Sequence, residues 1–160
     1  MLRICQPGDT ERIYFIINEA AKAYQGVIPA DCYHQPYMPL AELEQEMAEM
    51  TFFGWEEGGE LVGVMGFQPI KDVTLIRHAY VLPRWQRQGT ASRLIDNMKR
   101  LCKTPHLLVG TWADAYWAIA LYAKHRFQMK SDKDELLKTY WHISQRQIET
   151  SVVLGMEMGR

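Results

Sequence analysis

The sequence predicts an α/β or α+β layered fold, in which helices cover both faces of a mixed β-sheet. Two observations lead to this prediction. Segments with apolar residues at every third or fourth position, the spacing of an amphipathic helix, occur among short apolar runs that are typical of strands. Two of these runs, 51–57 and 60–68, meet at Gly58-Gly59, which is a strong signal for an antiparallel hairpin.

The segment before the hairpin is expected to hold one strand, two helices and a long loop. Residues 2–6 form a short apolar run and predict the strand. Asp9 is a helix-capping residue type, and the helix that it opens has one apolar face, made of Ile13, Ile16, Ile17, Ala20 and Tyr24. Three prolines in residues 26–39 exclude a regular helix and predict the loop. A second helix follows, with these residues on one side: Leu40, Leu43, Met47 and Met50.

After the hairpin, residues 73–82 alternate in polarity as a strand does. We expect one face of this strand to carry Val73, Leu75, Ala79 and Val81, and the other to carry Ile76, His78 and Tyr80. A helix with one apolar side is expected over 90–102, and a buried strand over 106–112.

The C-terminal part predicts two more helices and a closing strand. Residues 113–125 are rich in alanine and apolar nearly all round, which indicates a well-buried helix. Ser131 and Asp134 resemble a capping box that opens a short helix. Residues 150–156 read as the last strand.

Composition limits the classes of function. The 160 residues suit a single domain over 1–160, and a net charge of −1 gives no basic field, so we expect no nucleic-acid partner. The three cysteines are widely spaced and predict neither a disulfide framework nor a metal site. We therefore expect a cytoplasmic protein outside the membrane. Its thiols are expected to be reduced, no apolar run is long enough for a membrane span, and no signal-peptide pattern is seen.

The most informative stretch joins the strand over 73–82 to the following helix. It reads VLPRWQRQGTASRL, with Gly89 just before the helix begins. The first N–H groups of a helix are free and the helix dipole is positive there, so such a turn binds phosphate well. Arg84, Arg87 and Arg93 add positive charge. The pattern is neither a Walker loop nor the dinucleotide GxGxxG, and by itself it also fits a simple connecting loop.

Two motifs together resemble a known family. The segment from Gln86 to Ala91, QRQGTA, matches the Q/R-x-x-G-x-G/A motif of the GNAT superfamily of acyl-CoA-dependent N-acyltransferases. The segment from Ala118 to Phe127 is similar to the family's A-x-x-L-Y-x-K-x-G-F element. The order of expected elements also agrees with the family over nearly the whole chain. The resemblance implies a mixed, mostly antiparallel sheet of about six to seven strands, flanked by helices on both faces.

The resemblance also implies a co-substrate, acetyl-CoA, and the residues that bind it. The family's loop amides hold the pyrophosphate of coenzyme A, which here corresponds to Gln86, Arg87, Gln88, Gly89, Thr90 and Ala91. The pantetheine arm pairs with the strand before the loop, along the backbone of Ala79 and Val81, and that strand separates from the one over 106–112 to make room. A backbone N–H near Ala79 or Tyr80 would polarise the thioester carbonyl.

The implied catalytic residues are Tyr122 and His78. Tyr122 matches the family tyrosine that protonates the leaving thiolate of coenzyme A, although a buried core tyrosine is the alternative. The general base that deprotonates the amine is less clearly marked. His78 is the near-neutral titrating group of its strand, and it shares the candidacy with Glu56 and Glu57. The strand's alternation places His78 opposite Ala79 and Val81 unless a bulge redirects it.

Two positions depart from the family pattern. Ala115 stands where many members have an asparagine, so either one polar contact is lost or Asp114 replaces it. Arg126 stands where the family has a glycine before the phenylalanine. Either the helix ends differently here or Arg126 lies near the phosphates of the ligand.

Candidate acceptor residues lie in the proline-rich loop, where Tyr33, His34 and Tyr37 accompany Asp31. Aromatic and acidic groups suit an ammonium group. The glutamates of the next helix read as a solvated face. The extra helix near 132–141 has two candidate roles, a cap over the pocket or a contact in a homodimer.

The function expected from these observations is acetyl or acyl transfer to a primary amine of a small molecule or peptide, by direct attack in a ternary complex and without a metal. The alternative is a catalytically weak module that binds acyl-CoA as a sensor or scaffold.

Overall fold

One seven-stranded sheet forms the centre of the computed structural model, which describes residues 1–159. The strands are β1 (Leu2–Ile4), β2 (Thr51–Glu57), β3 (Glu60–Ile70), β4 (Val73–Val81), β5 (His106–Trp112), β6 (Gln128–Met129) and β7 (Ser151–Glu157). They lie in the order β1-β2-β3-β4-β5-β7-β6, and all neighbours are antiparallel except β4 and β5. The expected mixed, mostly antiparallel sheet is thus confirmed.

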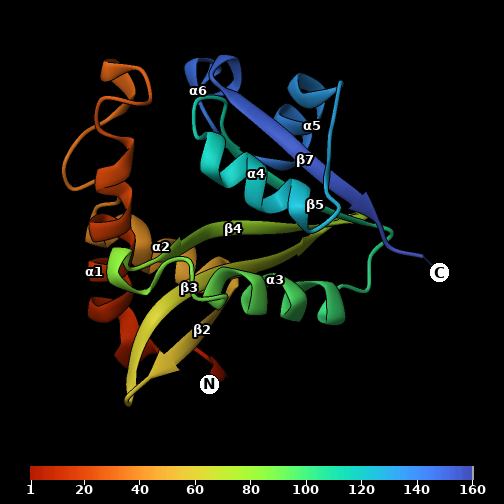
Figure 1. Cartoon of the computed structure of the whole chain (residues 1–160). Helices are drawn as coiled ribbons and strands as arrows, with labels where there is room; N and C mark the ends of the chain where they lie inside the picture. Colours follow the sequence, from red (N-terminus) through yellow and green to blue (C-terminus); the bar gives the residue numbers. More distant parts are fainter. Residues whose placement is uncertain (160) are drawn as a thin grey trace.

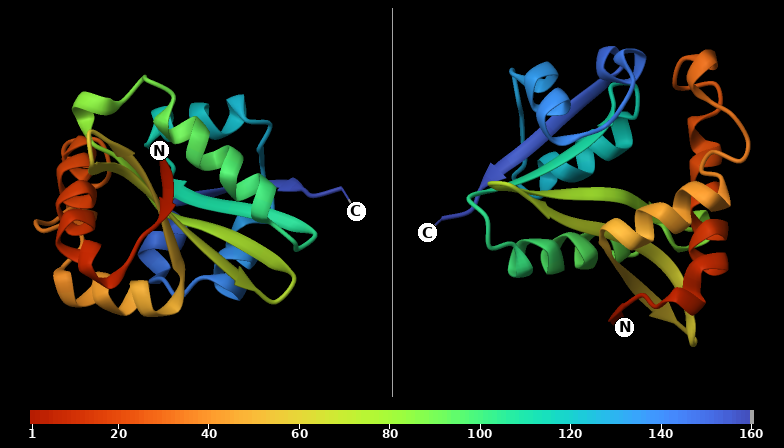
Figure 2. Two further views of the ribbon diagram at one scale, coloured as in Figure 1. Left: turned by 90° about the horizontal axis from the view of Figure 1, so that it is seen from below. Right: turned by 180° about the vertical axis from the view of Figure 1, so that it is seen from behind.

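Within residues 1–159, six α-helices cover both faces of this sheet (Figures 1 and 2). They are α1 (Thr10–Ala20), α2 (Leu40–Glu49), α3 (Thr90–Leu101), α4 (Tyr116–Lys124), α5 (Lys133–Tyr140) and α6 (Gln145–Glu149). Buried residues of α1 and α2 pack on the N-terminal half of the sheet, and those of α5 and α6 pack on the C-terminal half. Helices α3 and α4 share a separate core with strands from both halves. No helix among residues 1–159 is long and apolar enough to cross a membrane.

The two halves of the sheet separate along β4 and β5. These parallel strands pair only from Val73 opposite His106 to Ile76 opposite Val109, although both strands continue beyond this point. Figure 1 shows the two halves diverging toward the side where α1 lies. The backbone edge of β4 beyond Ile76 therefore has no ladder partner on β5.

A β-bulge interrupts β4 at His78. Arg77 lies opposite Gly66 and Tyr80 lies opposite Val64, so two residues of β4 face one residue of β3. His78 has a φ of 53°, in the left-handed region. The predicted alternation is therefore wrong past Ile76: Ala79 packs in the same core cluster as Ile76, whereas Val73 and Leu75 belong to another.

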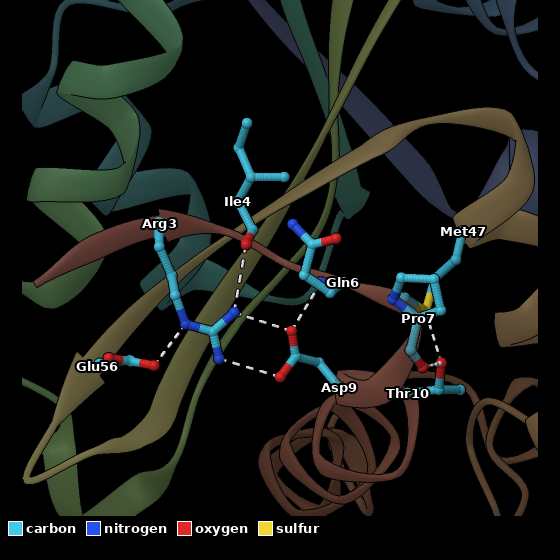
Figure 3. Close-up of polar contacts among 8 residues, drawn as sticks. All are labelled: Arg3, Ile4, Gln6, Pro7, Asp9, Thr10, Met47 and Glu56. Carbon is cyan, nitrogen blue, oxygen red and sulfur yellow. Dashed lines mark hydrogen bonds and ion pairs between the residues drawn. The ribbon is translucent and has the colours of Figure 1, made fainter.

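One arginine links the N-terminal strand to the start of α1 and to β2 (Figure 3). Arg3 of β1 donates two hydrogen bonds to Asp9, at 2.8 and 3.0 Å, and also bonds to Glu56 of β2. The Asp9 carboxylate further accepts a bond from the backbone N–H of Gln6, at 2.7 Å. Asp9 therefore caps the 3-10 turn before α1, and the prediction that its side chain caps α1 itself is wrong. The hydrogen bonds from Arg3 hold the pKa of Asp9 below its usual value.

Leu40 lies on the apolar side of α2 as expected, although it is 41% exposed. Two further local predictions are wrong. Helix α4 is not well buried, because Tyr116 and Trp117 lie at its exposed start. Helix α5 begins after Asp132 without a side-chain cap, so Ser131 and Asp134 form no capping box there. The short elements β6 and α6 carry too few residues to show a periodic pattern, and the sequence did not predict them.

Arg126 occupies a backbone position that usually requires glycine. Its φ is 73°, and two hydrogen bonds close the end of α4: Phe127 N–H to the Tyr122 carbonyl and Arg126 N–H to the Ala123 carbonyl, both 3.0 Å. This is a Schellman motif, and the rings of Tyr122 and Phe127 make its usual apolar contact, with centroids 5.5 Å apart. The helix thus ends as it would with glycine, and the expected alternative of a different exit is wrong.

Arg126→Gly is therefore expected to stabilise the protein. Relief of left-handed strain, about 1–2 kcal/mol, exceeds the added chain entropy of glycine, about 0.5–1 kcal/mol. The free energy of unfolding, measured by urea denaturation, should rise by about 0.5–1 kcal/mol. Arg126→Ala is the control, because it removes the side chain and keeps the strain. A glycine variant no more stable than the alanine variant would contradict this account.

Candidate active site

Two cavities meet where β4 and β5 separate. The larger, about 780 Å³, lies among β4, the loop after it, the start of α3, and α4. The smaller, about 140 Å³, is lined by β4, β5, the 26–39 loop and the C-terminal helices. A common wall lines both cavities, formed by Tyr24, Ile76, His78, Tyr80, Gly110 and Thr111. The separation of the strands thus brings two spaces into contact across one layer of side chains.

The loop between β4 and α3 presents backbone amides to the larger cavity. Gly89 precedes α3 with a φ of 84°, and Arg87 also has a positive φ, 64°. The first hydrogen bond of α3 runs from Arg93 N–H to the Gly89 carbonyl, at 3.0 Å. The amides of Thr90 and Ala91 precede this bond, so helix geometry gives them no carbonyl partner. The loop can therefore bind an anion through its main chain.

Side chains hold this loop in shape. Gln86 donates a hydrogen bond from Nε2 to the Val81 carbonyl, at 2.9 Å, which ties the loop to the end of β4. Arg93 donates to the Gln88 carbonyl at 3.2 Å, and its guanidinium lies 5.0 Å from the centre of the Trp55 ring. Gln88 points away, bonding to the Arg84 carbonyl at 3.2 Å. Gln86, Arg87, Gly89, Thr90 and Ala91 line the larger cavity, and Gln88 does not.

The wall of the larger cavity continues along β4. Ala79 and Val81 both line it, on the strand edge that β5 has left. An extended ligand arm can pair with such an edge as an added strand would. An unpaired strand edge that leads to a main-chain anion site fits an elongated ligand with phosphates at one end.

Tyr122 of α4 lies at the bottom of the same cavity. Its side chain is 3% exposed and lines the cavity wall. Burial raises the pKa of its phenol well above the ordinary value, so the group stays protonated at neutral pH. A protonated phenol can donate a proton or a hydrogen bond to a group in the cavity.

His78 lies in the wall between the two cavities. Its Nε2 is 2.9 Å from Oε1 of Glu46, which projects from α2, and each side chain is 15% exposed. Arg77 also contacts Glu46, with Nη2 at 3.3 Å from Oε1. The hydrogen bond with His78, followed by the charge of Arg77, lowers the pKa of Glu46. The prediction that the α2 glutamates form only a solvated face is wrong for Glu46, because the bulge in β4 was not visible in the sequence.

The rival bases lie elsewhere. Glu56 bonds to Arg3, and Glu57 accepts a hydrogen bond from Trp55 Nε1 at 2.9 Å. Neither residue lines either of the two cavities described above, and strand β3 lies between β2 and β4.

The loop aromatics are placed unequally. Tyr37 lines the smaller cavity, where its hydroxyl accepts a hydrogen bond from Trp112 Nε1 at 2.7 Å. Tyr33 and His34 stack on the Tyr37 ring, at centroid distances of 6.3 Å, and line neither cavity. Asp31 pairs with Arg146 of α6, at 2.9 and 3.0 Å, so its carboxylate is already engaged.

The chain beyond β5 closes the smaller cavity. Leu137 of α5, Trp141 and Ile143 line it, which fits the pocket-cap role of the extra helix. Ala115 is fully buried beside Tyr24 and Trp112, and Asp114, the candidate replacement for a polar residue there, lines neither cavity. No cluster of three or more metal-ligating side chains occurs within residues 1–159.

Comparisons with known proteins agree with this geometry. The model of the acetyltransferase (GNAT) family matches residues 13–127, which is more than half of the chain. No curated protein matches the sequence.

Several solved structures share the fold. The ribosomal-protein-S18-alanine N-acetyltransferase of Escherichia coli has a TM-score of 0.70 at 16% identity, covering 100% of this chain and 94% of that one. The PaiA N-acetyltransferase of Thermoplasma acidophilum, solved with coenzyme A, has a TM-score of 0.72 at 13% identity, covering 98% of each chain. The N-acetylglutamate synthase of Neisseria gonorrhoeae, solved with coenzyme A and N-acetylglutamate, has a TM-score of 0.69 at 23% identity, covering 100% of this chain and 35% of that one.

Gly89→Ala is expected to destabilise the protein. The loop would hold the new alanine at a left-handed φ of 84°, which costs an L-residue about 1–2 kcal/mol. The control is Gly8→Ala, because Gly8 has no positive φ and no atom within 4 Å of an added Cβ. Urea denaturation should show the loss for Gly89→Ala alone, and equal stabilities of the two variants would refute the strained-loop account.

Proposed function

The chain belongs to the acetyltransferase (GNAT) family, and from this premise we propose that it transfers an acetyl group from acetyl-CoA to a primary amine of a small molecule or peptide. The observation that supports this most is the junction of two cavities across the wall that holds His78. A donor in the larger cavity and an acceptor in the smaller one would meet at that wall. One domain over residues 1–160 would hold both.

The larger cavity suits the donor. Acetyl-CoA, when bound, supplies the acetyl group as an activated thioester. The amides around Gly89 would hold its pyrophosphate, with Gln86 fixing the loop, and the free edge of β4 at Ala79 and Val81 would hold the pantetheine arm. A backbone N–H near Ala79 would stabilise negative charge on the thioester oxygen.

The smaller cavity suits the acceptor. This cavity is lined by four aromatic rings that can offer their faces to an ammonium group, those of Tyr24, Tyr37, Tyr80 and Trp112. Tyr33 and His34 would act on the acceptor only by supporting the Tyr37 ring. The ion pair of Asp31 with Arg146 joins the 26–39 loop to α6, and both of these segments line the smaller cavity, which favours a small amine over a bulky one.

His78 is proposed to take the proton from the acceptor ammonium, which must become neutral before it can attack. Tyr122 is proposed to donate its proton to the departing sulfur, and its raised pKa means that the phenol is protonated when the thiolate leaves. None of the three cysteines lines either cavity, and burial raises the pKa of Cys5 to about 12. These positions favour direct attack by the amine over an acyl-enzyme intermediate.

One prediction of the proposed function concerns turnover. Incubation with acetyl-CoA and a panel of small primary amines should release free thiol in step with N-acetylated product. Thiol release with no amine present, or with no acetylated product, would argue against transfer. Tight acetyl-CoA binding by calorimetry without turnover for any amine would instead favour the binding module.

The second prediction concerns the two proton carriers. His78→Ala and Tyr122→Phe should each lower kcat by about 10²–10⁴-fold, with little change in acetyl-CoA affinity, because each removes a proton-transfer group. His142→Ala and Tyr116→Phe are matched controls, since both residues are exposed and line neither cavity. A kcat within about twofold of wild type for either test variant would remove that residue from the mechanism.

A further inference from the structure

Glu46 has no part in the function proposed above, yet it is the carboxylate in contact with His78. It reaches His78 from α2, a helix more than twenty residues away in sequence, and its side chain is 15% exposed. We infer that Glu46 is a positioning residue, an inference that rests on the proposed function. Glu46 orients the His78 ring and fixes its tautomer, so that Nδ1 is the basic nitrogen toward the acceptor amine.

The contact selects one ring nitrogen. The 2.9 Å distance joins Nε2 of His78 to Oε1 of Glu46. An ionised carboxylate only accepts hydrogen bonds, so Nε2 must carry the proton and Nδ1 must keep its lone pair in the neutral ring. No other side chain in the described part of the protein forms a hydrogen bond with this ring. The free nitrogen is thus available for proton transfer.

Beside the hydrogen bond with His78, the charge of Arg77 helps to keep the Glu46 carboxylate ionised. Its guanidinium lies 3.3 Å from the same Oε1 and also donates to Gln68, at 3.3 Å. The titratable groups around His78 are Glu46 from α2, Arg77 from its own strand, and three phenols that line the smaller cavity together with it. These phenols belong to Tyr24, Tyr37 and Tyr80, and burial raises the pKa of each, so they are neutral at pH 7. Glu46 is therefore the one anion among these groups.

The backbone and a second ring hold His78 in place. Its φ of 53° costs about 1–2 kcal/mol for an L-residue, and such strain gathers at functional sites. The bulge turns Arg77 and His78 toward the same carboxylate, which a regular strand would prevent by sending them to opposite faces. The His78 ring also stacks on Phe52, with centroids 6.0 Å apart and planes at 10°. Strand, helix and aromatic ring together fix its orientation.

The first test measures the tautomer directly. In full-length protein with ¹⁵N-labelled histidine, the neutral ring of His78 should show a protonated Nε2 and an unprotonated Nδ1. Glu46→Ala should convert this to a mixture of tautomers, and Glu44→Ala should not, because Glu44 is exposed on the same helix. A protonated Nδ1 in the wild type, or an unchanged ring in Glu46→Ala, would overturn the inference.

The second test separates positioning from a merely structural ion pair. Glu46→Ala should lower kcat about 10–100-fold with little change in acetyl-CoA affinity, and Glu46→Gln should recover part of that rate, because its amide oxygen accepts the same bond. The double variant with His78→Ala should be no slower than His78→Ala alone. A further loss in the double variant, or full activity in Glu46→Ala, would refute the positioning role. Absence of turnover in the wild type would sink the proposed function instead, while the tautomer measurement still decides on the contact.

Discussion

The end of hydrogen bonding between β4 and β5 is the constraint on which the rest of the structure depends. Parallel strands that paired to their full length would close the sheet and leave no room between its halves. Because pairing stops at Ile76 and Val109, one strand edge stays free and two cavities meet there. Helices α3 and α4 share a core with strands of both halves, and this core holds the two halves together beside the opening.

The bulge at His78 connects this opening to the helices on the other face. An extra residue in β4 shifts the phase of the strand, so that Ala79 follows Ile76 into the core shared with α3 and α4, while His78 turns toward α2. The strained φ at His78 is balanced by bonds and stacking that involve Glu46 and Phe52. Local strain and tertiary contacts thus fix one imidazole at the point where the two cavities meet.

Sequence patterns predicted the sheet, the hairpin at Gly58-Gly59 and the loop before α3, because each depends on residues close together in the chain. They failed where the outcome depends on distant contacts. Glu46 lies three residues after Leu43 and four before Met50, at the border of the apolar face of α2, and only the bulge in another element brings it a histidine partner. Tyr33 and His34 have suitable chemistry, but Tyr37 occupies the cavity wall in front of them. Periodicity carries no information about such pairings.

The two cavities are lined largely by different segments of the chain, which affects how substitutions can change one cavity without the other. The loop after β4 and helix α4 line only the larger cavity, whereas the 26–39 loop and the C-terminal helices line only the smaller one. Most substitutions in the 26–39 loop or the C-terminal helices should leave the larger cavity unchanged, because distant sites without shared partners behave additively. Under the proposed function, substitutions in the 26–39 loop and the C-terminal helices would change the acceptor, whereas a change in the shared wall around His78 and Gly110 would alter both cavities at once.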